Sequence, residues 1–127
     1  MTPEQRAKAT VMRYVDEVWN AHDLDAIDDI FHENFRYYGF TAGDAIGGRA
    51  AIRPFYENLL QAFPDIRAEV DTQVAEGNRV ATFKTVRGTH RGESHGIQAS
   101  GKRIEVFVAD VFRVEKNKII ESWALLD

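Results

Sequence analysis

Apolar side chains recur at helical intervals along the first part of the chain. The segment 2–20 opens with Thr2-Pro3-Glu4-Gln5, which has the spacing of a capping box and places proline at the first helical position. Its apolar positions are three or four residues apart: Ala7, Val11, Tyr14/Val15 and Val18. This pattern predicts a helix that runs to about Asn20.

A second, shorter helical pattern follows. Asp23 is a candidate N-cap, and Leu24, Ile27 and Ile30/Phe31 form one apolar stripe. The next stretch, NFRYYGFT, has an extended character and leads into the glycine-rich segment AGDAIGG. That segment lacks the spacing of both a phosphate-binding loop and a dinucleotide fingerprint, so we interpret it as a turn.

A third helical pattern lies between Gly48 and Phe63, and Pro64-Asp65 ends it. Pro54 conflicts with a helix that begins at Arg49, because proline removes a helical hydrogen bond. The helix therefore either begins near Ile52 or kinks at Pro54.

The second half of the chain has strand-like, β-branched runs at 66–75, 79–88, 104–114 and 118–126, with the turn sequences EGNR and EKNK. Helices followed by consecutive strands predict an α+β fold with an antiparallel sheet. The stretch THRGESHGIQASGK is long for a hairpin loop, so we interpret it as a rim or lid element.

Length and composition narrow the picture further. The chain has 127 residues, enough for one domain with one core, and we expect that domain to span 1–127. Sixteen Lys+Arg against twenty Asp+Glu give a net charge of -4 without long charged blocks, which argues against a nucleic-acid partner. There are no cysteines, the N-terminus is too polar for a signal peptide, and no apolar run is long enough to cross a membrane. We expect a soluble, cytoplasmic protein.

One carboxylate interrupts an apolar run. In VADVFRV, Asp110 would share a strand face with Val106, Val108, Phe112 and Val114. A buried aspartate is normally paired, protonated or aimed at a ligand, because burying it alone as an ion is costly. In an apolar pocket Asp110 could act as a general acid or base. On residue type alone, a structural aspartate bonded to an arginine or to backbone amides is the more frequent case.

Several separated motifs resemble, in order, those of the SnoaL-like polyketide cyclases. These motifs are RYVDEVWNAHDLDAIDDIF, GGRAAIRPFYENLLQAFPDI, VAEGNRVATFKTVRGTHRGE and GKRIEVFVADVFRVEKNKIIESW. The family belongs to the superfamily of nuclear transport factor 2 and the ketosteroid isomerases. The resemblance implies a cone-shaped fold of three N-terminal helices on a curved antiparallel sheet of four to six strands. It also implies an apolar pocket inside the cone and a homodimer formed through the sheet.

The resemblance carries two site residues over to this chain. The cyclases and the ketosteroid isomerases place a working aspartate just before a DVFR-like segment, which corresponds to Asp110. The helix piece RYVDEV resembles the isomerase helix that supplies a tyrosine to the oxyanion hole, which corresponds to Tyr14. From the residue pattern alone, Tyr14 is more often a packed core tyrosine whose hydroxyl has a partner.

The chain also departs from the family pattern. Tyr38-Gly39 stands where the isomerases have an aspartate base and many cyclase-like members have a histidine pair. Asp44 is nearby but lies in the glycine-rich segment, and we do not assign it that role. The usual PPTG is replaced by Gln98-Ala99-Ser100-Gly101. These departures leave the lid contacts and the catalytic competence open.

His90 lies at a family motif position at the end of a strand. It could assist proton transfer, since its charge changes near neutral pH, or it could tie the long loop to Glu93. The histidines do not form a set with metal-ligand spacing, so we predict no metal. The aromatic residues that we expect to line a pocket, with an ordinary core as the alternative, are Trp19, Tyr38, Phe55, Phe63, Phe112 and Trp123.

The sequence therefore predicts a cyclase-like enzyme that needs no cofactor and acts on a small hydrophobic carbonyl or ester compound. Asp110 would move a proton, while Tyr14, with His90 as a further candidate, would stabilise the enolate. The alternatives are a non-catalytic binding domain for a small apolar ligand, and an isomerase or dehydratase of the same superfamily. A limonene-type epoxide hydrolase is disfavoured, because Asp110 and Arg113 fall on opposite strand faces.

Overall fold

The computed structural model describes residues 1–39, 43, 45–94 and 96–126. The first helical stretch is α1, Pro3–Tyr14, which continues as the π-helical turn η1, Val15–Asn20. The predicted capping box is present, since the Thr2 hydroxyl accepts a hydrogen bond from the Gln5 amide and the Gln5 side chain accepts one from the Thr2 amide. The predicted helix to Asn20 is confirmed, with its last part wound more widely than an α-helix.

The other two helices each begin with a 3-10 turn. Turn η2, Leu24–Ala26, leads into α2, Ile27–Ile30, and turn η3, Arg49–Ala51, leads into α3, Ile52–Ala62. Pro54 stands in the first turn of α3, where its missing N–H breaks no helical hydrogen bond. The late start of this helix is therefore the alternative that holds. None of the helices within the described ranges is long and apolar enough to cross a membrane.

Six strands form one sheet in the order β2-β1-β6-β5-β4-β3. Their bounds are β1 Phe31–Gly39, β2 Gly47–Gly48, β3 Arg67–Glu76, β4 Arg79–Thr89, β5 Arg103–Glu115 and β6 Lys118–Leu126. The pairs β1–β2, β3–β4, β4–β5 and β5–β6 are antiparallel, as predicted for the sheet. Only the β1–β6 pair among the described strands is parallel. The sheet is mixed because the chain crosses over through α3 after β1, so that β1 and β6 run in the same direction. Phe31, expected on a helix stripe, begins β1 and is still buried.

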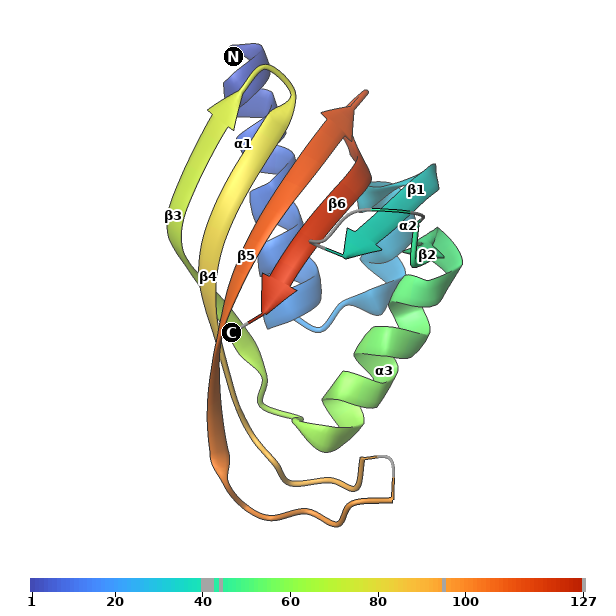
Figure 1. Ribbon diagram of the computed structural model, residues 1–127, viewed down its shortest axis with the longest axis vertical. Coiled ribbons are helices and arrows are strands. Elements are labelled where there is room, and N and C mark those ends of the chain that lie inside the picture. Colours follow the sequence, from blue (N-terminus) through green and yellow to red (C-terminus); the bar gives the residue numbers. More distant parts are fainter. Residues whose placement is uncertain (40–42, 44, 95, 127) are drawn as a thin grey trace.

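The helices lie on one side of the sheet, and the core fills the space between them. Figure 1 shows α1 passing behind the strongly twisted strands β4 and β5, with α3 beside the lower part of the sheet. Strand alternation sends Val80, Val86, Val108 and Phe112 to this inner face, where all four are buried. Phe83 and Phe107 alternate with them and remain exposed on the outer face.

The long connection between β4 and β5 is attached to the end of α3. The amides of Arg91 and Gly92 both donate to the carbonyl of Ala62, at 3.0 and 3.2 Å. A Cβ atom at Gly92 would lie 1.8 Å from the carbonyl oxygen of Gln61, so the backbones approach closely enough to require glycine. The connection therefore folds under the C-terminal end of α3, which Figure 1 shows at the lower edge of the molecule.

Candidate functional site

Asp110 lies on the inner face of the sheet, in the middle of β5. It is flanked by Thr82 of β4 and Ala124 of β6, and only 7% of its surface is exposed. Phe112 shares this face and is also buried. The predicted sharing of one strand face by Asp110 and Phe112 is therefore what the structure shows, and that face points toward the core.

The partner of Asp110 is Lys84. The Lys84 ammonium nitrogen lies 2.7 Å from Oδ2 of Asp110, and Lys84 is only 2% exposed. Lys84 lies on β4 two positions from Thr82, so its side chain reaches the carboxylate diagonally across the strand pair. The positive charge stabilises the ionised carboxylate, which explains why an aspartate can be buried in this strand.

Aromatic rings surround the Lys84 ammonium. The nitrogen lies 5.0 Å from the ring centre of Trp19, 5.3 Å from that of Tyr14 and 5.8 Å from that of Phe112. Such distances allow cation–π attraction between the amine and the rings. The Lys84 amine is therefore enclosed by Asp110 on one side and by three aromatic rings around it.

The sequence interpretation missed Lys84, although a signal was available. In VATFKTV the positions Val80, Thr82, Lys84 and Val86 alternate onto one strand face, and Lys84 is the only charge among them. A lysine in that position needs a buried anion. Asp110 on the neighbouring strand is that anion, but only the register between the two strands shows that Lys84 and Asp110 lie together.

The carboxylate retains unused hydrogen-bonding capacity. Lys84 Nζ, at 2.7 Å, is the ion-pair partner of Asp110 Oδ2, and this oxygen has no further partner among the described residues. Thr82 Oγ1, on the neighbouring strand, is likewise buried and unpartnered within the described ranges. Buried polar atoms without partners are infrequent, and they are expected where a ligand completes the site.

Tyr14 is held in a chain of three polar aromatic residues. The indole nitrogen of Trp19 donates to the Tyr14 hydroxyl at 2.9 Å, and the Tyr14 and Tyr56 hydroxyls share a hydrogen bond. The π-helical turn η1 lies between Tyr14 and Trp19, and its wider winding brings residues five apart onto the same side. Burial raises the pKa of both Tyr14 and Tyr56 above its ordinary value. Both hydroxyls therefore stay protonated at neutral pH.

Tyr14→Phe should destabilise the fold by about 1–3 kcal/mol, because it leaves the Trp19 indole N–H and the Tyr56 hydroxyl without their shared partner in a buried place. Urea unfolding followed by circular dichroism measures this loss. Tyr38→Phe is the matched control, since its hydroxyl makes one longer bond, 3.3 Å to Glu121, and we expect it to cost much less. Equal losses in the two variants would contradict the shared role of the Tyr14 hydroxyl.

Tyr37 is a partly buried residue close enough to Asp110 to be affected by its charge. Its ring packs against the core but is only partly buried, and its pKa is raised by burial and then by the negative charge of Asp110. Other partly buried apolar residues lie along the inner side of the cone, on α3, after it and on β5: Ile52, Leu59, Leu60, Phe63 and Val106. All of them pack against the core, and together with Tyr37 we call them the apolar rim.

The structure gathers only part of the predicted pocket around Asp110. Trp19 and Phe112 stand beside Lys84, as described. Tyr38 and Trp123 stack on each other with ring centres 5.4 Å apart, at strand positions that alternate away from Asp110. Phe55 is 56% exposed on α3. Tyr38, Trp123 and Phe55 therefore do not lie at the Asp110 carboxylate.

His90 and Phe63 form a separate contact near the end of α3. Their ring centres are 5.4 Å apart, and His90 Nδ1 lies 3.1 Å from the hydroxyl of Ser100. His90 follows Lys84 by roughly 20 Å of extended strand, so it does not reach Asp110 in this arrangement. It holds the long connection through Ser100. Asp44 lies outside the described residues.

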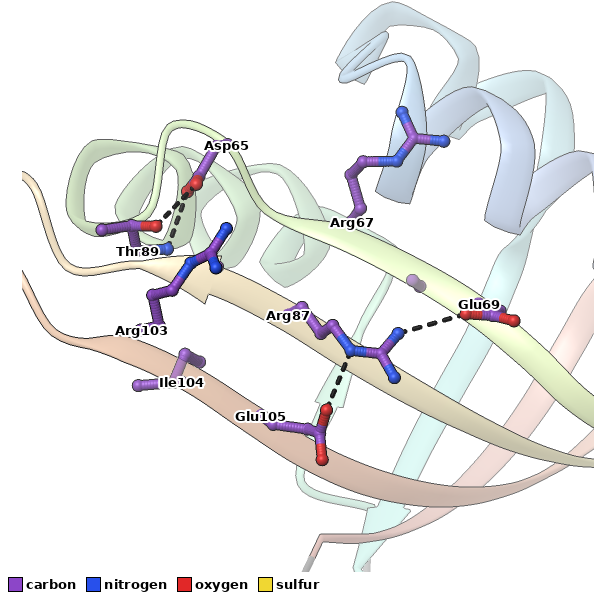
Figure 2. Close-up of a pocket in the computed structure, with 10 residues that line it drawn as sticks. Asp65, Arg67, Glu69, Arg87, Thr89, Arg103, Ile104 and Glu105 are labelled. Carbon is purple, nitrogen blue, oxygen red and sulfur yellow. Dashed lines mark hydrogen bonds and ion pairs between the residues drawn. The ribbon is translucent and has the colours of Figure 1, made fainter.

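Two hollows of the surface lie away from Asp110. Figure 2 shows one of about 840 Å³, lined by residues of β3, β4 and β5 together with Asp65. A second hollow, of about 540 Å³, lies near Asp28, Asn34 and Arg49. No three residues of the metal-ligating types cluster in the part of the chain that the structure describes.

Comparison with known proteins relates this chain to one family. The family model of the SnoaL-like polyketide cyclases matches residues 9–127. No curated protein sequence matches the chain.

Three solved structures resemble this one closely. AclR from Streptomyces galilaeus, a proposed hydroxylase, is 30% identical with a TM-score of 0.87 over 98% of this chain and 76% of its own. A proposed SnoaL-like polyketide cyclase from Jannaschia sp. CCS1 is 25% identical, with a TM-score of 0.85 over 100% and 89%. IdmH from Streptomyces antibioticus, a proposed polyketide cyclase, is 27% identical, with a TM-score of 0.81 over 95% and 91%. These likenesses confirm the predicted fold.

Proposed function

Because the chain belongs to the SnoaL-like polyketide cyclase family, we propose that it closes a ring in a small hydrophobic carbonyl or ester compound by an intramolecular aldol reaction. The observation that carries this proposal is the buried Asp110, which is paired with Lys84 and whose Oδ2 has no partner besides that ammonium among the described residues. An ionised carboxylate of this kind is equipped to act as a base.

In the proposed reaction Asp110 takes a proton from the carbon next to a carbonyl group. The C–H electron pair moves into the substrate and leaves negative charge on the carbonyl oxygen. The enolate carbon then attacks a second carbonyl of the same molecule, and the new alkoxide takes the proton back from Asp110, which regenerates the carboxylate. No electrons are gained or lost overall, so these steps call for no redox cofactor.

Lys84 and Tyr14 supply the stabilisation that such an enolate requires. The Lys84 ammonium lies beside Asp110 and over the Tyr14 ring, so negative charge that develops on the substrate meets a fixed positive charge. The Tyr14 hydroxyl accepts from Trp19, and it can donate its proton to the enolate when Tyr56 is the donor in their shared hydrogen bond. The surrounding rings exclude water, which strengthens both interactions.

The apolar rim defines the substrate class. Tyr37, Leu59, Phe63 and Val106 are only partly buried, so they can exchange solvent contact for contact with a hydrophobic molecule. The substrate would enter between α3 and the inner face of the sheet and place its carbonyl near Lys84. Its apolar body would then cover the rim.

Hydrogen exchange in D₂O tests this proposal without knowledge of the natural substrate. A panel of apolar β-keto esters and diketones is incubated with the protein, and mass spectrometry follows deuterium uptake and ring closure. We expect accelerated exchange for the compounds that fit the rim. If no compound exchanges, and a ligand copurifies and is released unchanged, the protein is a binding domain, which Gly39 at the expected base position also favours.

We also propose that two copies of the chain associate through the outer face of the sheet. Phe83, Ala109 and Leu125 form a cross-strand row there, and Phe107 lies next to it on β5. Phe83 is 57% and Phe107 is 53% exposed. A continuous apolar patch of this kind is typical of an interface, and a sheet face can be self-complementary about a two-fold axis.

Phe107→Glu should therefore convert a dimer into a monomer, because it places a charge at the centre of the patch. Light scattering coupled to size-exclusion chromatography measures the mass. Ile97→Glu is the matched control, since Ile97 is an exposed apolar residue in the long connection, away from the strands. A monomeric wild-type protein, or a dimer that survives Phe107→Glu, would contradict this interface.

A further inference from the structure

A hollow on the outer face of the sheet carries an unusual arrangement of charge. It measures about 840 Å³ and lies where β3, β4 and β5 twist away from the rest of the sheet. Three arginines, Arg67, Arg87 and Arg103, come from these three strands in turn. Arg67 and Arg87 are direct cross-strand partners, a pairing of like charges that is unfavourable unless other groups offset it.

The acidic side chains of the hollow already have partners. Arg87 donates to Glu105 at 2.9 Å and to Glu69 at 3.1 Å, so one guanidinium joins both carboxylates (Figure 2). Asp65 accepts hydrogen bonds from the amide and the hydroxyl of Thr89, at 2.7 and 2.8 Å. These bonds lower the pKa of Asp65.

Two of the three arginines have no partner within the described part of the chain, although the three arginines and three carboxylates of the lining balance in charge. Neither Arg67 nor Arg103 has an ion pair or a side-chain hydrogen bond among the residues that the structure describes, and no dashed line reaches either of them in Figure 2. Their strands lie on the two sides of β4, about 10 Å apart. Arginine side chains are long and flexible enough to converge from both sides on a group placed above β4.

We propose that this hollow binds a compact oxyanion, a carboxylate or phosphate group of a small molecule, between Arg67 and Arg103. Guanidinium groups match such anions with paired hydrogen bonds. Arg87 forms the middle of the site, where Glu69 and Glu105 hold its side chain in place. The site lies on the opposite face of the sheet from Asp110, so it binds its ligand independently of the proposed reaction.

NMR titration of the full chain with inorganic phosphate and, separately, with succinate tests this proposal. We expect saturable shifts of the arginine side-chain Nε–H signals and of the Gly88 and Thr89 amides, and a loss of affinity as sodium chloride is raised. Binding of phosphate alone, of succinate alone or of both supports the site, and the pattern identifies the preferred anion. Shifts that do not saturate would overturn it.

The variant Arg67→Gln/Arg103→Gln should bind the preferred anion at least tenfold more weakly. The matched control is Arg6→Gln/Arg53→Gln, which removes the same charge from exposed positions on α1 and α3. Circular dichroism checks that both variants are folded. Equal weakening in the two double variants would show attraction by overall charge and would overturn the assignment to this hollow. Such a failure leaves the D₂O exchange of the proposed enzyme unaffected.

Discussion

Lys84→Met should lower the free energy of unfolding by about 3–5 kcal/mol. The substitution keeps an unbranched side chain of similar length among the rings of Tyr14, Trp19 and Phe112, so packing is largely preserved. What it removes is the positive charge, and Asp110 is then left as an unpaired carboxylate in a buried place. Urea unfolding, followed by circular dichroism, gives the free energy.

Two further variants separate the charge effect from the packing effect. Lys102→Met removes an exposed lysine of the long connection and should change stability little. Lys84→Met/Asp110→Asn removes both charges and should be more stable than Lys84→Met alone, because no buried ion remains uncompensated. If the double variant instead lost as much as the two single variants added together, the Lys84–Asp110 pair would contribute nothing by its charge.

Asp110→Asn should lower the rate of α-deuterium exchange, and of ring closure, by about 10²–10⁴-fold. The amide has nearly the same shape as the carboxylate but cannot accept a proton from carbon. The rate is measured on any compound that the wild-type protein exchanges in D₂O. Glu115→Gln is the matched control, because Glu115 is an exposed carboxylate at the end of the same strand.

The same experiment separates catalysis from binding. An Asp110→Asn protein that still binds the exchanging compound, as shown by quenching of tryptophan fluorescence, has lost the chemical step alone. Retention of the full exchange rate would show that Asp110 is not the base, and the proposed mechanism would be wrong. A loss of binding together with the rate would assign Asp110 a structural role in forming the site.

Much of the fold could be predicted from local patterns. The capping box at Thr2 and the alternation around Asp110 each depend on a few neighbouring residues, and both are present in the structure. The parallel pairing of β1 with β6 could not be predicted in this way. It depends on where the chain crosses over, and the sequence of β1 alone carries no sign of its partner.

The candidate site was predicted only in part for a similar reason. Asp110 could be identified from its own strand as an acid within an apolar run, but its partner Lys84 depends on the register between two strands. Tyr38 and Trp123 are aromatic and semi-buried like true pocket residues, yet they stack at positions that alternate away from Asp110. A shift of one residue along a strand moves a side chain to the other face of the sheet, and the amino-acid composition of the strand does not show which face that is.

The π-helical turn η1 also constrains how this chain can change in evolution. Removing one residue from Val15–Asn20 would restore ordinary α-helical winding and rotate everything beyond the deletion by about 100°. Trp19 would then leave Tyr14, and Asn20, which pairs with both backbone groups of Ala68, would leave β3. Single-residue deletions should therefore be rare among homologues in this turn, while substitutions at its exposed Asp16 should be common.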